Sequence, residues 1–126
     1  MEMFKMGKKS LACLASVKTE LECIARLALY LSEVDFSITE GIRTLERQKL
    51  LVAEGKSTTI NSRHLLGEAV DFAAYIDGRL NWDDIESYEK IGAAFKQAAK
   101  MLGYSITWGG DWINFKDYCH VQIEKE

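Results

Sequence analysis

The chain has 126 residues, of which 48% are hydrophobic and 28% are charged, and its net charge is −3. This length suits one hydrophobic core, so we expect residues 1–126 to form a single domain. The slightly acidic balance and the lack of a basic run argue against nucleic acid as the main partner. No apolar stretch approaches the roughly 20 residues of a membrane-spanning helix, so membrane insertion is not expected.

The three cysteines, Cys13, Cys23 and Cys119, are widely spaced and form no Cys-x-x-Cys pair. Their odd number and spacing predict reduced, buried thiols rather than a disulfide scaffold. Residues 1–10 are basic, but the apolar segment and small-residue cleavage site of a signal peptide do not follow them. The sequence therefore predicts a protein that stays in the cytoplasm unless another factor exports it.

Two helices are predicted near the N-terminus. Ser10 is expected to cap a short helix that ends near Ala15. Residues 19–22, Thr-Glu-Leu-Glu, have the form of a capping box, in which the Thr hydroxyl and the second Glu carboxylate serve the first free N–H groups of a helix. This second helix is expected to reach about Ser32, and its apolar stripe at helical spacing is interpreted as core.

A strand and a third helix are expected next. Residues 34–39 alternate between apolar and polar side chains, which predicts a half-buried strand. Thr44 is expected to cap a helix over residues 45–54, and Gly55 closes it at a position that favours left-handed backbone. Arg43 then lies at a strand-to-helix junction, where its side chain can be held firmly and still point into a cleft.

A second strand carries an unusual carboxylate. Residues 56–62 are polar and predict a loop, and residues 69–75 predict the strand. Period-two alternation places Asp71 on one face with Ala69 and Ala73. An aspartate between alanines on a central strand is costly to bury unless it is paired or bound to a cation. Asp71 is the strongest physical indication of a metal in the sequence.

A turn and a long helix follow this strand. Asp77-Gly78 is a strong tight-turn signal. Asp83 or Asp84 can cap the helix, and Gly103 is expected to end it. The buried stripe of this helix is interpreted as core.

The chain is expected to end with two strands, residues 104–108 and 119–124, joined through a loop that begins at residues 109–112. This arrangement predicts a hairpin-like return. With helices before and between the strands, the fold class is α+β, with a small, mostly antiparallel sheet packed with three main helices.

Parity along the last strand separates its side chains. His120 and Gln122 share one face, and Cys119 points to the other. If His120 faces a cleft, Cys119 faces the core, so Cys119 is rejected as a metal ligand. Asp117 can reach the same site only from the preceding loop.

His64 and His120 are the two histidines of the chain. With Asp71 they provide two imidazoles and a carboxylate from separated segments, which match the three protein ligands of a catalytic Zn²⁺ whose fourth position holds water. Such a site lowers the pKa of water from 15.7 to about 7 and polarises a carbonyl group. A lone histidine is more often a hydrogen-bonded residue than a ligand. The prediction of a metal therefore depends on the residues that surround each candidate ligand in the sequence.

Three blocks of sequence carry a resemblance to a known family. They are Glu-Gly-Ile-Arg-Thr-Leu-Glu-Arg-Gln at residues 40–48, Asn-Ser-Arg-His-x-x-Gly-x-Ala-Val-Asp at residues 61–71, and Trp-Gly-Gly-Asp-Trp…Asp-x-x-His at residues 108–120. In order and approximate spacing, these blocks resemble the motifs of the M15 family of zinc peptidases. The chain is most similar to the phage endolysins that cut L-alanyl-D-glutamate bonds in peptidoglycan, which are relatives of the VanX/VanY-type D-Ala-D-Ala peptidases. The similarity covers nearly the whole chain from about Ser10.

The resemblance implies a metal centre and a base. His64, Asp71 and His120 would bind zinc in a cleft on the sheet. Asp117 would be the general base, which takes a proton from the metal-bound water and later gives it to the leaving amine. A simpler alternative for Asp117 is that it caps a turn.

The resemblance also implies residues that contact the substrate. Arg43 would steady the carbonyl oxygen or a substrate carboxylate. Ser62 corresponds to a position near the substrate, and Trp108 to a pocket wall. The alternative for Arg43 is a simple ion pair with Glu40 or Glu46, which would contribute little at the surface.

The function that the resemblance implies is a zinc-dependent peptidoglycan endopeptidase that hydrolyses the L-Ala–D-Glu bond of stem peptides during host cell lysis. A D-Ala-D-Ala carboxypeptidase or dipeptidase is the alternative within the class, because pocket shape decides between them. A non-catalytic wall-recognition module, with or without zinc, is the alternative outside it. The stem peptide is the expected partner of a monomeric enzyme, which waits in the host cytoplasm until holin-type release admits it to the periplasmic cell wall.

Overall fold

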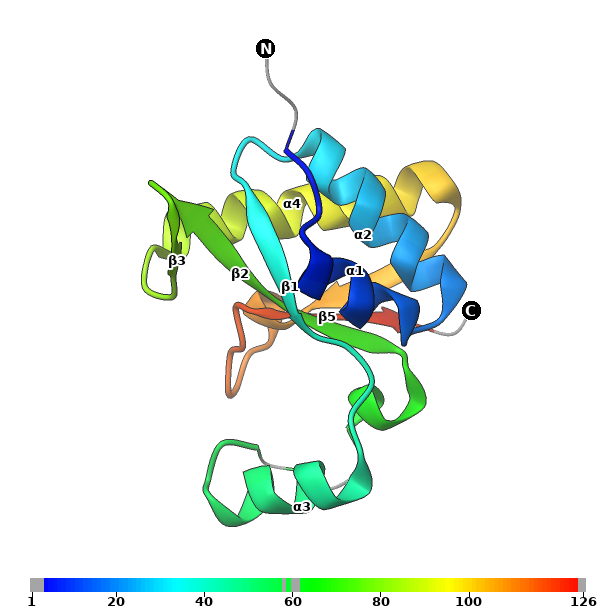
Figure 1. Cartoon of the computed structure of the whole chain (residues 1–126), viewed down its shortest axis with the longest axis vertical. Helices are drawn as coiled ribbons and strands as arrows, with labels where there is room; N and C mark the ends of the chain where they lie inside the picture. The colour runs from blue at the N-terminus through cyan, green and yellow to red at the C-terminus, as the bar shows by residue number, and fades with distance from the viewer. Residues whose placement is uncertain (1–3, 58, 60–61, 125–126) are drawn as a thin grey trace.

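The computed structural model describes residues 4–57, 59 and 62–124 (Figure 1). The predicted loop at residues 56–62 therefore lies partly outside the described residues, at positions 58, 60 and 61. In chain order, the elements are α1 (Lys8–Ala15), α2 (Thr19–Leu31), β1 (Phe36–Glu40), α3 (Leu45–Ala53), the 3-10 helix η1 (Arg63–Leu66), β2 (Ala69–Ile76), β3 (Arg79–Asn81), α4 (Ile85–Leu102), β4 (Ser105–Trp108), the 3-10 helix η2 (Gly109–Asp111) and β5 (His120–Glu124). Within the described ranges, no helix is both long enough and apolar enough to cross a membrane.

The strands form one antiparallel sheet in the order β1-β2-β5-β4, and the short β3 pairs with β2. This confirms the predicted α+β class with a small antiparallel sheet. β2 and β5 pair at the centre of the sheet, with Asp71 opposite His120. Because partners across a sheet point to the same face, this register brings the two side chains together.

The hydrophobic core lies on the other face of the sheet, between the strands and the helices α1, α2 and α4 (Figure 1). α2 packs on α4, and α1 packs on β1. α3 contributes no residue to this core and lies apart from the other helices, at the bottom of Figure 1. The largest fully buried core side chains are Tyr88, Phe36, Phe72, Phe95, Leu14, Leu21, Ile24, Ile38 and Ile91.

The predicted cap of α3 and the glycines predicted to follow α3 and α4 are confirmed, whereas Asp84, at the N-cap of α4, makes no side-chain capping bond. The Thr44 hydroxyl accepts the Arg47 N–H at 3.1 Å and so caps the start of α3. Gly55, with φ 75°, and Gly103, with φ 83°, follow the two helices in left-handed backbone. The sequence located these ends because capping is a local interaction.

The Asp77-Gly78 turn is also confirmed. Asp77 has φ 52° and Gly78 has φ 81°, which is the positive-φ pair of a two-residue hairpin turn. The turn joins β2 to β3, a short strand that the sequence pattern does not predict. Residues 79–81 were missed because only tertiary pairing with β2 makes so short and exposed a segment a strand.

The predicted role of Ser10 as a helix cap is wrong. Ser10 lies inside α1, whose N-cap is Gly7. The Ser10 side chain is buried, and its hydroxyl accepts the N–H of Ile38 at 2.9 Å. A contact with β1, 28 residues away, therefore decides what this serine does.

The predicted capping box at residues 19–22 is also wrong. α2 begins at Thr19 itself, with Lys18 as its N-cap and no side-chain capping bond. The Lys18 N–H donates to the Gly67 carbonyl at 2.9 Å, and its ammonium group pairs with the buried Glu68 carboxylate at 2.6 Å. These tertiary contacts hold the start of the helix one residue earlier than the pattern predicts.

We expect Gly92→Ala to destabilise the fold. A Cβ at Gly92 would lie 2.7 Å from the buried indole of Trp108. Overpacking of this kind costs about 1–3 kcal/mol, against a gain of about 1 kcal/mol in helix propensity. Urea unfolding should show a net loss of stability, whereas Glu89→Ala at an exposed position of the same helix should change it by less than about 0.5 kcal/mol. An unchanged midpoint for Gly92→Ala would contradict the tight contact.

Candidate metal centre

The three side chains predicted as metal ligands meet on the face of the sheet opposite the core. One ligand atom from each of His64, Asp71 and His120 lies within 4.8 Å of the others. Asp71 Oδ1 is 3.1 Å from His64 Nε2 and 3.3 Å from His120 Nδ1. Ligand atoms at about 2.0–2.1 Å from a tetrahedral zinc are roughly 3.3 Å apart, so two of the three separations already suit a metal.

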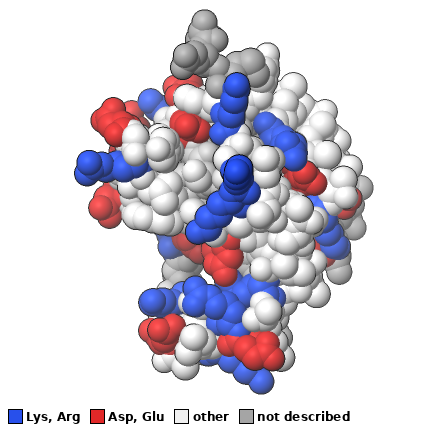
Figure 2. All heavy atoms as spheres, viewed as in Figure 1, with Lys and Arg blue, Asp and Glu red and all other residues white. Residues whose placement is uncertain are grey.

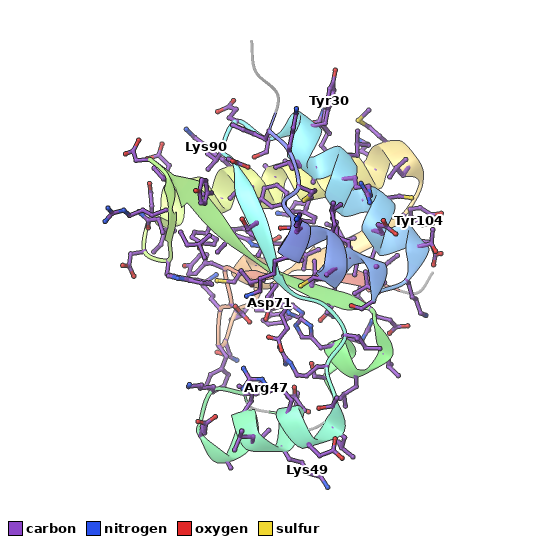
Figure 3. All side chains as sticks on the ribbon, viewed as in Figure 1. Tyr30, Arg47, Lys49, Asp71, Lys90 and Tyr104 are labelled. Atoms are coloured by element: carbon purple, nitrogen blue, oxygen red, sulfur yellow. The ribbon has the colours of Figure 1, made fainter. Side chains whose placement is uncertain are left out.

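Two different local structures supply the histidines. His120 begins β5 and is brought to Asp71 by the β2–β5 register. His64 lies in η1, where the Ser62 hydroxyl accepts its backbone N–H at 3.2 Å. Gly67, with φ 67°, ends η1 and turns the chain into β2. The cap, the short helix and the strand thus place His64 over Asp71, which lies near the middle of the molecule on the side facing α3 (Figure 3).

Hydrogen bonds leave one nitrogen of each imidazole facing Asp71. His64 Nδ1 is 2.9 Å from the Gly41 carbonyl oxygen, which can only accept a hydrogen bond. Nδ1 therefore carries the ring proton, and in the neutral ring Nε2 has a free lone pair. His120 Nε2 is 2.9 Å from Gln122 Oε1, which leaves Nδ1 facing Asp71. A ring lone pair of His64, the facing nitrogen of His120 and a carboxylate oxygen that converge in this way need a proton or a cation between them. The donor set therefore fits a bound metal ion.

Gly41 has to be glycine in this arrangement. A Cβ at Gly41 would lie 2.4 Å from the Cys13 carbonyl oxygen, so only glycine fits where the chain passes α1. Two residues further along, the backbone N–H of Arg43 donates to the His64 carbonyl at 2.9 Å. Together with the Gly41 carbonyl, which accepts from His64 Nδ1, this bond holds the segment after β1 against both the side chain and the backbone of His64.

Arg43 is the most heavily bonded cation of the site. Its Nε and Nη2 donate to the two Glu40 oxygens at 2.8 and 2.7 Å, and its Nη1 donates to Gln48 Oε1 at 2.7 Å. Nη2 also lies 3.3 Å from Asp71 Oδ2. Asp71 thus turns Oδ1 to the histidines and Oδ2 to the arginine. The considered ion pair with Glu40 is present, and it is part of the site rather than a surface pair.

The sequence pattern offers Glu40 only as a surface partner of Arg43 and does not place it in the site. β1 pairs regularly with β2 up to Ile38 opposite Phe72, and then its register shifts so that Glu40, not Thr39, lies opposite Asp71. This irregularity puts Glu40 on the same face as Asp71, within reach of Arg43. No signal in the sequence marks the irregularity.

Gln48 is a second residue that was missed. It is fully buried although it lies on α3, outside the core. Its Nε2 donates to Ser57 Oγ at 2.8 Å and to the Thr59 carbonyl, and its Oε1 accepts from Arg43. Its place at the end of the first motif, residues 40–48, was the available signal. Gln48 connects Arg43 to the loop that follows α3.

Opposing influences set the charge of the metal-free centre. Burial alone would raise the pKa of Asp71, but hydrogen bonds from His120 and His64 and the charges of these imidazoles hold that pKa well below its ordinary value. Burial alone would lower the pKa of His120, and its hydrogen bond to Asp71 and the Asp71 charge raise it instead. Without metal, the carboxylate is therefore ionised, and its charge favours the protonated form of His120.

Asp117 reaches the site from the loop before β5, as expected. Its N–H donates to the Gly109 carbonyl at 3.0 Å, and a Cβ at Gly109 would collide with the Asp117 carbonyl, so glycine permits this close approach. Its Oδ1 accepts the Cys119 N–H at 3.3 Å, so the residue also caps the turn into β5. Loss of hydration and the nearby Asp71 charge raise the pKa of Asp117, against the influence of His120.

Cys119 packs against the core as parity predicted, and it is not part of the His64–Asp71–His120 group. Burial, followed by the charges of Asp117 and Asp71, raises the pKa of its thiol to about 12. A neutral thiol turned toward the core is a poor metal ligand.

A cleft of about 750 Å³ opens over the three ligands, between the sheet and the α3 segment. Arg43, Ser62 and Asp117 line it together with the ligands, and Lys56 and Lys116 stand among its lining cations. Figure 2 shows Lys and Arg side chains gathered on the lower part of the molecule that carries α3. The cleft is therefore a polar groove with both signs of charge.

Trp108 lies elsewhere. The β4–β5 register pairs it with Val121, so its indole faces the core and is 5% exposed. Its Nε1–H donates to the Tyr118 carbonyl at 2.8 Å, and a Cβ at Gly110 would lie 2.3 Å from the ring. Trp108 supports the loop that carries Asp117 from beneath and is not among the residues that line the cleft.

Comparison with known proteins places the chain among named peptidases. The family model described as phage L-alanyl-D-glutamate peptidase matches residues 2–125. The L-alanyl-D-glutamate peptidase of Escherichia phage T5 is 43% identical over 125 residues, which cover 97% of this chain and 90% of that protein. The peptidoglycan L-alanyl-D-glutamate endopeptidase CwlK of Bacillus subtilis is 35% identical over 104 residues, covering 71% of this chain and 61% of that protein.

A solved structure shares the fold. The crystal structure of the Serratia marcescens L-Ala D-Glu endopeptidase ChiX matches with a TM-score of 0.90 and 38% sequence identity. The match covers 98% of this chain and 92% of that one.

We expect one divalent metal ion to bind per chain with an affinity that falls at low pH. A proton competes with the metal for each imidazole, and because the pKa of His120 is raised, the competition begins above about pH 6.5, the ordinary value for histidine. Competition with a chromophoric chelator measures this affinity. His64→Ala should abolish tight binding, whereas Cys119→Ala should leave it unchanged. Retention of tight binding in His64→Ala would refute the assigned ligand set.

Proposed function

Because the chain belongs to the phage L-alanyl-D-glutamate peptidase family, we propose that it is a zinc-dependent endopeptidase that hydrolyses the L-Ala–D-Glu bond of peptidoglycan stem peptides. The observation that carries this proposal is the convergence of His64, Asp71 and His120 in a cleft that Arg43 and Asp117 also line. The names of the relatives support the choice of bond. Two imidazoles and one carboxylate are the protein ligands of a catalytic zinc, which supports the choice of metal.

The proposed chemistry divides between the metal and the side chains. Bound zinc supplies a Lewis acid that polarises the scissile carbonyl and makes water acidic. Asp117 accepts a proton from the attacking water and delivers it to the leaving nitrogen. Its raised pKa supports this role, because a base whose pKa lies nearer the working pH can both take up and release the proton.

Arg43 stabilises negative charge on the reacting carbonyl oxygen or holds a substrate carboxylate. Four hydrogen bonds occupy its Nε–H, both Nη2 hydrogens and one Nη1 hydrogen, so among the described residues one Nη1–H lacks a partner. Glu40 and Gln48 hold the guanidinium rigidly, which favours stabilisation of developing charge. Ser62 contacts the substrate from the cleft wall, whereas Trp108 has only a structural role, because it supports the loop that carries Asp117 from the core side.

The remaining expectations follow from the same proposal. The enzyme acts as a single monomeric domain over residues 1–126, with the stem peptide as its partner. It waits in the host cytoplasm and reaches the periplasmic wall after holin-type release. The phage family model and the phage T5 relative support this setting.

The proposed reaction is tested by mass spectrometry of fragments released from purified Gram-negative peptidoglycan. We expect L-Ala ends on the glycan and peptides that begin with D-Glu, lost with a chelator and restored by Zn²⁺. Release of terminal D-Ala alone would indicate a carboxypeptidase instead. No fragments with any metal would favour a wall-recognition module.

The proposed base is tested by Asp117→Asn, which keeps the size of the side chain and an oxygen for the Cys119 N–H. Turnover should fall by about 10²–10⁴-fold because a general base is lost. Zinc affinity, measured by chelator competition, should remain within a few-fold of the parent. Asp83→Asn, at an exposed position between β3 and α4, is the matched control and should change neither quantity. Full wall lysis by Asp117→Asn would rule out this mechanism.

A further inference from the structure

We propose that Gln122, held by Glu124 and Arg63, sets the tautomer and orientation of His120 and thereby selects Nδ1 as its metal-binding atom. This inference rests on the proposed metal centre and adds three residues to it. Arg63 stands next to His64 in the second sequence motif, yet neither the metal centre nor the proposed chemistry gives it a role. Gln122 is a positioning residue, because it acts on the metal through His120.

The direction of each hydrogen bond in the series from Arg63 through Glu124 and Gln122 to His120 follows from the arginine, which can only donate. Arg63 Nη2 donates to Glu124 Oε2 at 3.1 Å, and Arg63 Nη1 donates to the Ile123 carbonyl at 2.8 Å. Both Glu124 oxygens can only accept when the carboxylate is ionised. The group that lies 2.6 Å from Glu124 Oε1 must therefore be the Gln122 amide nitrogen.

This orientation of the amide leaves only its oxygen for the histidine. Gln122 Oε1 lies 2.9 Å from His120 Nε2, and because an amide oxygen cannot donate, Nε2 must carry the ring proton. Nδ1 then presents its lone pair to Asp71 Oδ1, 3.3 Å away. The order Arg63, Glu124, Gln122, His120 thus determines where one proton sits.

The strand makes this arrangement possible. His120, Gln122 and Glu124 occupy alternate positions of β5 and share one face. Gln122 pairs across the sheet with Ala69, whose small side chain leaves room for the amide. Arg63 joins from η1, so the contacts link the segments that carry both proposed metal histidines.

Asp71 is the reason why the tautomer of His120 has to be held by other residues. A carboxylate 3.3 Å from His120 Nδ1 attracts the ring proton to that nitrogen, which is the wrong one for metal binding. Gln122 competes by accepting from Nε2. Groups that hold the second N–H of a ligating histidine typically change metal affinity or activity by 10–100-fold when they are mutated.

The test uses Gln122→Met, which removes both amide groups without changing the net charge. In metal-free protein at a pH where both imidazoles are neutral, ¹⁵N NMR should show opposite tautomers for the two histidines, with His64 protonated at Nδ1 and His120 at Nε2. In Gln122→Met the His120 proton should move to Nδ1, and zinc affinity measured by chelator competition should fall about 10-fold or more. His64 provides the internal reference in the same spectrum.

Two further variants separate this role from a general disturbance of the sheet. Gln122→Glu keeps an oxygen acceptor and should retain the parent His120 tautomer. Thr107→Val changes the β4 partner of Gln122 in the sheet and should alter neither tautomer nor zinc affinity. A parent protein with His120 protonated at Nδ1, or parent-like zinc affinity in Gln122→Met, would overturn the inference. Failure of the parent protein to bind zinc would instead refute the proposed function, because the tautomers are measured without metal.

Discussion

The carboxylate of Asp71 is the group on which the site depends. Its Oδ1 faces both histidines and its Oδ2 faces Arg43, so one side chain on a central strand holds three others in place. A partly buried anion of this kind is stable only when each oxygen is satisfied. The strand pairing, the 3-10 helix of His64 and the segment after β1 all converge on it. The same requirement makes the position suited to a metal, since the lone pairs around Oδ1 need a positive partner.

The two sides of the cleft are built differently. The sheet side is rigid, because its outer face carries two of the proposed ligands, Asp71 and His120, and its inner face carries the core. The α3 side adds nothing to the core and is held through polar contacts of Arg43 and Gln48. The side chains on rigid elements keep their geometry, while a wall held by a few hydrogen bonds can adjust to a bound molecule. Arg43 belongs to both sides and couples them.

The position of the loop that carries the proposed base depends on close contacts at three glycines. Trp108 fills the space beneath the loop, with Gly92 and Gly110 against its ring. Gly109 allows the Asp117 backbone to approach within hydrogen-bonding distance. The carboxylate of Asp117, the proposed base, therefore owes its position to packing on the core side of β4. This relation connects the stability of the fold to the geometry of the proposed chemistry.

The sequence by itself determined the features that depend on local rules. Period-two alternation separated Asp71 from the core residues of β2 and turned Cys119 away from the site, and local capping located the start of α3. The tertiary structure decided everything that depends on contacts between distant segments. Because of such contacts, Ser10 bonds to β1 instead of capping a helix. A register shift places Glu40 opposite Asp71, and the β4–β5 pairing turns Trp108 toward the core. The physical reason is that strand register and burial are set by pairing across the sheet, which a linear pattern does not contain.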